Sequence, residues 1–536
     1  MTVQLRASSD LGGIAADIPW IAVTGTAPPA GRGAKLADAP RLLEQAFDAI
    51  RDEWWGLGKA LGATPSAEWA HAPTCASYGS DLGIMLAWTR LADDLGKSAG
   101  DVLMVCDDPW LFRHLAGRPG IEAGQAPALW PKRIGHALRG IAARGRLAVH
   151  LLGTNLVLRG HRRRVPTAAP TLVVYGHPAS RADGWDAYFG DLMDRLSGLN
   201  RLLHTDCRGG RARHLSAGGR ASSLHPWGEP AHLLALPFTR WRPSANDAAG
   251  PLGWLVRRAA VLEGGRAAAA ATRWQIGCQE AWLKARRPPV VAWPWENHPW
   301  ERALVRTARR LGIATVGYQH TVIGRHMYNQ SPASNPDGLA GLPDVIVCNG
   351  PAYRRQLEAW GVPADRLAVG GAFRLANQDI VHDVQAPVFV ALSSDTDISA
   401  QMMAAVRALG PTKRRFVVKD HPMYPFEFAE TETLRRTTRV LPRHRALSGV
   451  LYSTGTVGLE ALLAGLPTFR FRPEGRIAID ILPDGVAAVP VDAESLEEAL
   501  ATARPPQTMD RGGVMAAVDL AVWRRYLMAG GNEPSC

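Results

Sequence analysis

The sequence predicts an α/β protein whose strands form parallel, doubly wound sheets. Short apolar runs of strand length alternate along most of the chain with segments of helical periodicity, which is typical of βαβ units. No internal repeat of short period is visible. Because the length of 536 residues exceeds what one hydrophobic core usually serves, we expect at least two domains.

Composition narrows the class of partner. The formal net charge of +12, mostly from Arg, suits a membrane surface, a nucleic acid or a phosphorylated ligand. The Arg residues are spread along the chain and do not gather with aromatics, so we expect no nucleic-acid partner. The N-terminus lacks a basic region followed by an apolar core, so we expect no signal peptide and only a peripheral membrane contact, at the inner face of the cytoplasmic membrane. Six cysteines without metal or redox spacing indicate reduced thiols in a cytoplasmic protein: Cys75, Cys106, Cys207, Cys278, Cys348 and Cys536.

Residues 1–384 are predicted to form a first Rossmann-like domain, in which 1–165 is a candidate sub-domain. The expected strands are apolar runs at 18–24, 101–108, 171–175, 231–238, 289–293, 313–318, 344–349 and 367–370. The expected helices lie between them at 41–61, 82–95, 185–203, 253–284, 301–311 and 352–360. Asp107 and Asp108 end one of these strands, and we favour capping of the next helix over binding of a hydroxyl-rich ligand.

Residues 385–505 are predicted to form a second Rossmann-like domain. Its expected strands are 387–392, 416–419, 449–452, 468–471 and 487–491, and its expected helices are 457–463 and 494–501. The remaining residues, 506–536, would form a C-terminal helix and tail. Met515, Val518, Val522 and Tyr526 form an apolar stripe along the predicted helix 514–528, so we expect that helix to pack back onto the protein.

A hydroxyl-rich turn, Ser453-Thr454-Gly455-Thr456, separates the strand 449–452 from the helix 457–463. Free backbone N–H groups, hydroxyls and the positive end of a helix dipole suit a phosphate. The alternative is that Ser or Thr only caps the helix. His421, in Asp420-His421-Pro422, follows the strand 416–419 of the same predicted sheet. Ligands bind beyond the carboxyl ends of parallel strands, so both segments would lie at one ligand-binding edge.

The C-terminal third of the chain resembles glycosyltransferases of the GT-B fold, in which two Rossmann-like domains face a cleft. The residues that carry the resemblance are 344–374, His421-Pro422 and 453–467. More narrowly, they resemble the bacterial surface-polysaccharide group of capsule polysialyltransferases, 3-deoxy-manno-octulosonate (Kdo) transferases and CDP-glycerol glycerophosphotransferases. The N-terminal half is similar to O-antigen and surface-carbohydrate biosynthesis proteins, without a sharp motif.

The resemblance implies a nucleotide site in the second domain. Negative charge grows on the leaving phosphate during sugar transfer, so fixed hydrogen-bond donors are needed there. His421 would donate from its ring as a catalytic residue, and Glu460 would accept from the ribose. No metal ligand and no cofactor is expected, because GT-B enzymes generally work without one. The remaining nucleotide-binding candidates are Ser453, Thr454, Gly455, Thr456, Lys419 and Arg374.

The acceptor hydroxyl needs a general base, for which we select Glu296. It follows a predicted strand and lies among tryptophans that could raise its pKa by desolvation and stack on sugars, Trp295 above all. The alternative is that Glu296 is only a charge at a helix N-terminus and that the tryptophans are core. His298 and His320 are the further acceptor-side candidates.

Together these residues predict a cytoplasmic, metal-independent, inverting glycosyltransferase. Its partners would be a nucleotide sugar and a glycan or lipid-linked acceptor. The favoured donor is a CMP-activated Kdo or nonulosonic acid, because the His-Pro and hydroxyl-turn pair resembles the polysialyltransferase pattern. A nucleotide-diphosphate sugar or CDP-glycerol is the alternative donor. A non-catalytic GT-B-like scaffold that binds nucleotide or glycan is the alternative from another class.

Overall fold

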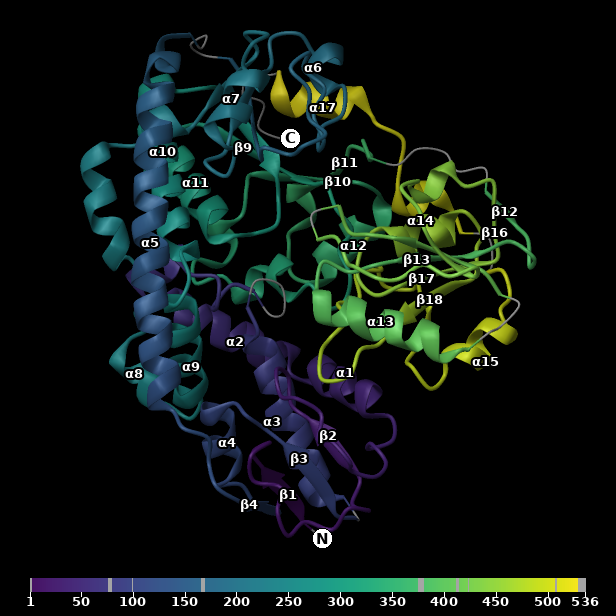
Figure 1. Ribbon diagram of the computed structural model, residues 1–536. Helices are drawn as coiled ribbons and strands as arrows, with labels where there is room; N and C mark the ends of the chain where they lie inside the picture. The colour runs from purple at the N-terminus through teal and green to yellow at the C-terminus, as the bar shows by residue number, and fades with distance from the viewer. Residues whose placement is uncertain are drawn as a thin grey trace.

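The computed structural model describes residues 2–75, 80–98, 100–164, 169–374, 380–410, 414–422, 424–506 and 509–528, with the backbone alone for 163 and 164. Three parallel sheets of four, seven and six strands carry the fold (Figure 1). The predicted α/β class with doubly wound parallel sheets is therefore confirmed.

The first unit is a four-stranded sheet. Its spatial order is β2 (Trp20–Ala22), β3 (Val102–Val105), β1 (Val3–Arg6) and β4 (Ile121–Ala123). Its helices are α1 (Ala39–Ala49), α2 (Arg51–Gly62), α3 (Leu82–Lys97) and α4 (Pro109–Leu115). Two predictions need correction here. A strand precedes the one predicted at 18–24, and the single helix predicted at 41–61 is two helices that meet at Ile50, whose φ of −91° and ψ of 2° are not helical.

The central unit is the seven-stranded sheet. Its order is β11 (Leu367–Val369), β10 (Val345–Cys348), β9 (Ala314–Gln319), β8 (Val290–Pro294), β5 (Thr171–Val174), β6 (Asn200–Leu203) and β7 (Ala221–Ser223). Its helices are α5 (Trp130–Leu158), α6 (Leu192–Arg195), α7 (Gly209–Leu215), α8 (Ala245–Ala249), α9 (Gly253–Gly264), α10 (Ala268–Arg286), α11 (Pro299–Arg310) and α12 (Pro351–Ala359). The long helix α5 lies along one side of this unit (Figure 1).

Two elements predicted in the central unit are wrong. The segment 231–238 is not a strand but the 3-10 helix η4 (Pro230–Phe238), because Pro230 and Pro237 lack the N–H that a ladder needs. The segment 185–203 is not one helix. Gly190 and Gly198 have φ of 54° and 87°, so the chain forms only the short α6 there and then enters β6.

The C-terminal sheet matches its prediction closely. Its order is β15 (Leu434–Arg436), β14 (Phe416–Lys419), β13 (Val388–Ala391), β17 (Gly449–Tyr452), β18 (Thr468–Phe471) and β19 (Val489–Val491). Its helices are α13 (Thr396–Ala408), α14 (Val457–Leu463) and α15 (Leu496–Ala501), and β12 (Val381–His382) pairs with β16 (Ala446–Leu447) beside it. The strands 416–419, 449–452 and 468–471 and the helix 457–463 are confirmed at both ends.

The chain ends with a helix that packs back onto the central unit, as expected, although it is shorter than predicted. After α16 (Arg511–Val514), α17 covers only Leu520–Leu527. Trp523 is fully buried and donates from Nε1 to the carbonyl of Gly370 at 3.0 Å. The helix therefore lies against the central sheet, next to α6 (Figure 1).

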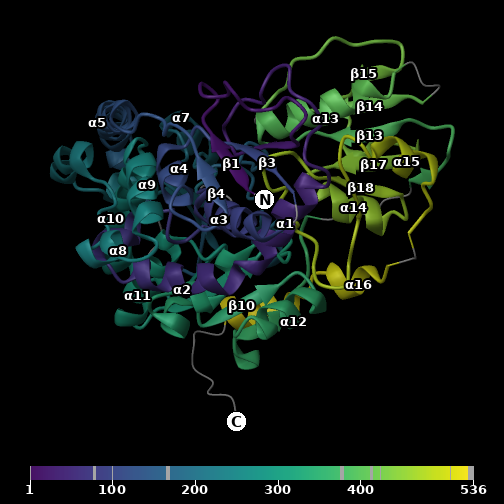
Figure 2. The ribbon, with the colours of Figure 1, turned by 90° about the horizontal axis from the view of Figure 1, so that it is seen from below.

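The first unit contacts both of the others. Trp55 Nε1 donates to the carbonyl of Tyr328 at 2.9 Å, and Lys35 pairs with Glu474 at 2.6 Å. Figure 1 shows β1 and β3 below the central unit and the C-terminal sheet, and Figure 2 views the molecule from that side. A single core cluster also joins the central sheet to Tyr452 and Leu459 of the C-terminal unit. Shared cores of this kind hold the three units together.

Candidate functional site

The hydroxyl-rich turn forms as predicted between β17 and α14. Gly455 has a φ of 137°, a conformation open to glycine, and its α-carbon faces open space. Ser453 is buried, and its Oγ has no hydrogen-bond partner among the described residues. Thr456 occupies the N-cap of α14 without a side-chain capping bond within the described part of the chain. The hydroxyls of Ser453 and Thr456 are thus not engaged in the helix-capping alternative.

His421 lies at the same edge of the sheet as this turn. Strand β13 separates β14 from β17, and Ala391 is in register with both Lys419 and Tyr452. Because neighbouring strands are about 4.8 Å apart, the two strand ends are roughly 10 Å apart. Burial and then the charge of Lys419 lower the pKa of His421, so this ring is a neutral hydrogen-bonding group at pH 7.

On the other side, Glu301 shapes the segment that follows β8. Its buried carboxylate accepts from Trp293 Nε1 at 2.9 Å and from the backbone N–H groups of Glu296 and Asn297, both at 3.0 Å. Asn297 has a φ of 60°, so the chain turns sharply there. This turn places Glu296 and His298 beyond the carboxyl end of β8. Burial raises the pKa of Glu301 to about 7.

The Glu296 carboxylate lies between two imidazoles. His298 Nε2 is 2.8 Å from Oε2, and His320 Nε2 is 3.6 Å from Oε1. Burial raises the pKa of Glu296, but the hydrogen bond and charge of His298 outweigh burial and lower it to about 2. The expectation that desolvation by aromatics raises this pKa is therefore wrong in its net direction. Glu296 is ionised at neutral pH.

The two histidines differ in protonation. Burial works against a charge on His298, but its contacts with Cys75 and Glu296 raise its pKa well above the usual value. Burial lowers the pKa of His320 to about 4, although the Glu296 carboxylate acts in the opposite direction. His320 Nδ1 is buried without a hydrogen-bond partner among the described residues. One carboxylate thus holds an imidazolium on one side and a neutral imidazole on the other.

Arg374 connects the two halves of the site electrostatically. Its guanidinium lies over the Tyr188 ring, 5.4 Å from the centroid. At the central sheet, the pKa of Glu296 is set mainly by burial and His298, and that of His320 mainly by burial and Glu296. The positive charge of Arg374 makes a smaller contribution that lowers both pKa values. At the C-terminal unit, burial raises the pKa of Glu460, and Arg374 is the first group to offset this. Arg374 is therefore close enough to both units for its charge to act on Glu296 of the central unit and on Glu460 of the C-terminal unit.

Trp295 does not have the expected role. It is 1% exposed and packs against Gly317 in the central core, together with Trp293 and Trp300. Because a stacking ring must be open to the sugar, we correct the expectation that Trp295 binds an acceptor. The alternative interpretation, in which these tryptophans are core, is the one that the structure supports. Asp108 is a helix cap, as favoured, since it accepts from the N–H groups of Trp110 and Leu111.

Sequence reasoning missed His71 and Cys75, which lie beside His298, and Tyr188, which lies beside His320. Burial raises the pKa of Cys75, but the neighbouring rings of His298 and His71 outweigh this and lower it to about 6. Their spacing of four residues, His71 to Cys75, was the available signal. Tyr188, whose ring meets His320 edge to face at 5.0 Å, was missed because it lies in the segment wrongly predicted as a helix.

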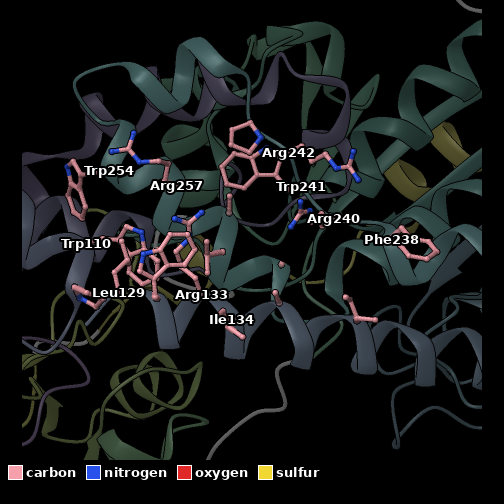
Figure 3. A pocket seen from close by; sticks show the side chains of 18 of the residues that line it. Trp110, Leu129, Arg133, Ile134, Phe238, Arg240, Trp241, Arg242, Trp254 and Arg257 are labelled. Atoms are coloured by element: carbon pink, nitrogen blue, oxygen red, sulfur yellow. The ribbon is translucent and has the colours of Figure 1, made fainter. Parts of the chain in front are cut away.

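A separate hollow of about 990 Å³ lies between α5, α9 and the chain around Trp241 (Figure 3). Its walls combine aromatic and aliphatic side chains with six arginines, and no Asp or Glu is among the described residues that line it. The arginines are Arg113, Arg133, Arg144, Arg240, Arg242 and Arg257. Such a hollow suits an anion that also carries apolar groups.

No known protein family and no curated protein matches the sequence. Among solved structures, a UDP-N-acetylglucosamine 2-epimerase from Rickettsia bellii is similar with a TM-score of 0.37 and 12% identity, over 65% of this chain and 91% of the other. The glycotransferase of kitacinnamycin is similar with a TM-score of 0.37 and 14% identity, over 68% and 96% of the two chains. The glycosyltransferase SnogD from Streptomyces nogalater has the same score and identity, over 62% and 93%.

The arrangement of the sheets defines the class of fold. The central and C-terminal units are both large, parallel, doubly wound sheets, and the last helix crosses back from the C-terminal unit to the central unit. This is the GT-B fold, here with an additional four-stranded unit at the N-terminus. Within the described part of the chain, no helix is both long and apolar enough to cross a bilayer.

Proposed function

We propose that the protein is an inverting glycosyltransferase that moves a sugar from a nucleotide donor to a bacterial surface glycan, without a metal at the donor phosphate. The observation that supports this most is the position of Arg374. Its charge acts both on Glu296 and His320 at the central sheet and on Glu460 of α14 in the C-terminal unit. A cation at this point can stabilise the negative charge that a leaving phosphate gains.

The donor that we favour is a CMP-activated Kdo or nonulosonic acid. His421 and Ser453 lie at one edge of the C-terminal sheet, with Lys419 beside them. A neutral imidazole and the Ser453 hydroxyl, which has no partner among the described residues, can donate to a single phosphate, as a CMP donor requires. The alternative donors are a nucleotide-diphosphate sugar and CDP-glycerol, which carry two phosphates.

The base that we infer is a pair and not Glu296 alone. Both oxygens of Glu296 are already engaged, by His298 and His320, whereas His320 Nδ1 has no partner among the described residues. In the reaction, His320 takes the proton of the acceptor hydroxyl, and the oxygen attacks the anomeric carbon. The bond to the nucleotide phosphate breaks and its electron pair leaves with the phosphate. Glu296 stabilises the imidazolium that forms.

The acceptor that we favour is lipid-linked and reached from the membrane surface. Trp130, Ile134, Leu138 and Ile141 form an exposed stripe along α5, and Leu138 is 65% exposed. The helix carries five basic side chains and no acidic one. An apolar stripe flanked by basic groups is what binds an anionic lipid surface. The arginine-lined hollow of Figure 3 opens beside this stripe.

Nucleotide binding tests the donor. In a thermal-shift series with CMP, CDP, UDP, GDP and their sugars, we expect selective stabilisation by CMP, of about 2.7 kcal/mol at a hundredfold excess over Kd. Preference for UDP or GDP would replace the favoured donor by the nucleotide-diphosphate alternative. If no nucleotide raises the unfolding temperature, the proposed function is wrong.

One variant separates the enzyme from a non-catalytic scaffold. With Glu296→Gln, an enzyme should lose about 10²–10⁴-fold in turnover while its affinity for CMP stays unchanged. A scaffold has no turnover to lose in the parent protein. Glu53→Gln, at an exposed position of α2, is the matched control and should keep full activity.

Co-sedimentation with vesicles tests the membrane contact. The protein should bind vesicles that contain phosphatidylglycerol more tightly than pure phosphatidylcholine, and Leu138→Asp should weaken that binding. Val440→Asp places the same charge on an exposed residue of the C-terminal unit and should have no effect. Equal binding of both variants would exclude the α5 surface as the contact.

A further inference from the structure

Two histidines and a cysteine meet where the first unit joins the central sheet. His71 and Cys75 lie in the segment between the 3-10 helix η1 (Pro65–Trp69) and α3, and His298 precedes α11. One ligand atom from each of the three lies within 4.8 Å of the others. The ring centroids of His71 and His298 are 6.1 Å apart. The three residues come from distant parts of the chain, so the fold itself assembles the cluster.

The ring of His298 is held as a metal ligand would be. Its Nε2 bonds to Glu296 at 2.8 Å, which leaves Nδ1 as the ring nitrogen available to a ligand. Nδ1 is buried and has no hydrogen-bond partner among the described residues. Metal-ligating histidines commonly give their other nitrogen to a carboxylate, which fixes the ring. Glu296 is placed to do this.

The other two ligands are also fixed by their surroundings. The buried carboxylate of Glu263 accepts from the N–H groups of His71 and Ala72, both at 2.9 Å. Thr74 Oγ1 donates back to the carbonyls of Ala70 and His71. These hydrogen bonds hold the backbone around His71 in place before any ion binds.

The ligand atoms of the cluster, two imidazole nitrogens and one sulfur, indicate which metal ion would bind. We propose that His71, Cys75 and His298 bind a zinc ion, with Glu296 holding the His298 ring. Two imidazoles and one thiolate suit Zn²⁺ better than Mg²⁺ or Ca²⁺, which prefer oxygen ligands. Zinc takes a thiolate and a neutral imidazole, so binding releases to solvent the proton that Cys75 and His298 hold between them. Three protein ligands leave a fourth position open for water or a substrate group.

A path for the ion exists. A hollow of about 500 Å³ is lined by His71 and Glu263. The site would tie the η1–α3 segment to the start of α11, next to the Glu296 and His320 pair. It revises the expectation that the chain holds no metal, and it stands whether or not the proposed sugar transfer is correct, because its test does not measure activity.

Metal analysis of the full chain tests the proposal. After removal of metal by a chelator and dialysis against zinc, we expect one zinc ion per chain. Replacement by Co²⁺ should produce a thiolate-to-cobalt charge-transfer band. Cys75→Ser should abolish that band, and His71→Asn and His298→Asn should each weaken binding. Glu296→Gln should weaken it by about 10–100-fold, as expected of a group that only holds the ring.

His232→Asn is the matched control, because His232 is an exposed histidine of η4 that lies outside the cluster. It should leave metal content and the cobalt spectrum unchanged. Circular dichroism of each variant shows whether it folds, and His71 is only half-buried, so its replacement keeps the test open if Cys75→Ser fails to fold. Absence of the charge-transfer band, or a band that survives Cys75→Ser, would overturn the zinc site and leave a metal-free thiolate–imidazolium pair.

Discussion

Glu44 of α1 accepts hydrogen bonds from Arg470 of β18, so the first long helix of the chain is ion-paired to the last sheet. Both side chains are buried, at 6% and 4% exposure. Arg472 and Arg325 bond to the same carboxylate, so one acid serves three arginines from two other units. The N-terminal unit is therefore fastened to the sheet that carries the proposed nucleotide site.

Glu44→Gln should destabilise the protein strongly. The amide leaves three guanidinium groups without their shared counter-charge, and breaking one side of a buried ion pair typically costs about 3–5 kcal/mol. Calorimetric unfolding should show a clearly lower midpoint. Glu53→Gln removes an exposed carboxylate from the neighbouring helix α2 and should change stability by less than about 0.5 kcal/mol. Equal midpoints for the two variants would contradict the ion-pair account.

The carboxylates of Glu44 and Asp48 should make the stability of the protein depend on pH in the acid range. Burial raises the pKa of Glu44, but Arg470, His326 and Arg472 outweigh burial and lower it. The pKa of Asp48 is lowered in the same way by His326 and Arg325. In the folded state these two carboxyl groups have pKa values below their unfolded values of about 3.9–4.3. The stabilisation that they provide is therefore fully present above the unfolded pKa values, and it is lost as pH falls through the folded ones.

We therefore expect the contribution of Glu44 and Asp48 to stability to be constant from neutral pH to about pH 5 and to be lost below about pH 4. In Glu44→Gln the remaining dependence should be weaker, because one of the two linked carboxylates is gone. Thermal unfolding followed at a series of pH values measures both slopes. Parallel curves for the parent and the variant would show that Glu44 is not a source of the acid dependence.

The C-terminal sheet could be predicted from sequence because its signals are local. Strand β17, the hydroxyl turn and α14 follow one another within twenty residues, and Gly465 and Pro467 mark the helix end. The apolar run at 231–238 misled the prediction because its prolines exclude a ladder, and it packs as a 3-10 helix that buries Leu233 and Leu236 and exposes Leu234 and Phe238. Strand β1, Val-Gln-Leu-Arg, is too short and too polar to stand out.

The acceptor side could be predicted only in part. The predicted ends of two neighbouring strands, β8 and β9, placed Glu296 and His320 correctly at one edge of the sheet. The direction of the Glu296 pKa could not be predicted, because it depends on His298 turning back onto the carboxylate. The pairs of Cys75 with His298 and of Glu44 with Arg470 join residues hundreds of positions apart, and a single sequence carries no signal for such pairs.

The backbone of the hydroxyl turn should control nucleotide affinity. At φ 137°, Gly455 adopts a conformation that L-residues rarely reach, although a Cβ would meet no atom within 4 Å. Gly455→Ala should therefore push the turn out of its binding conformation and weaken nucleotide binding by about 5- to 150-fold, for a strain of about 1–3 kcal/mol. Isothermal titration with CMP measures this.

Gly410→Ala is the matched control for that experiment. Gly410 follows α13 with a φ of 68° and also has open space around it. Its replacement imposes comparable strain outside the turn and should lower stability without changing the CMP affinity. An equal loss of affinity in both variants would mean that general destabilisation, and not the turn, determines binding.

The last helix should matter for the site as well as for stability. Trp523 is fully buried and donates to the carbonyl of Gly370, and its ring lies 5.5 Å from that of Phe373, the residue before Arg374. Trp523→Ala should cost about 3–5 kcal/mol of stability and should release the segment that positions Arg374. Trp523→Phe keeps most of the packing and loses the hydrogen bond, so its stability should lie between that of the parent protein and that of Trp523→Ala.

Met528→Ala, at a partly exposed position after the same helix, is the control and should leave both the unfolding midpoint and the CMP affinity unchanged. If Trp523→Phe retains full CMP affinity while Trp523→Ala loses it, packing against Phe373 positions Arg374; if both retain it, α17 has no part in the site.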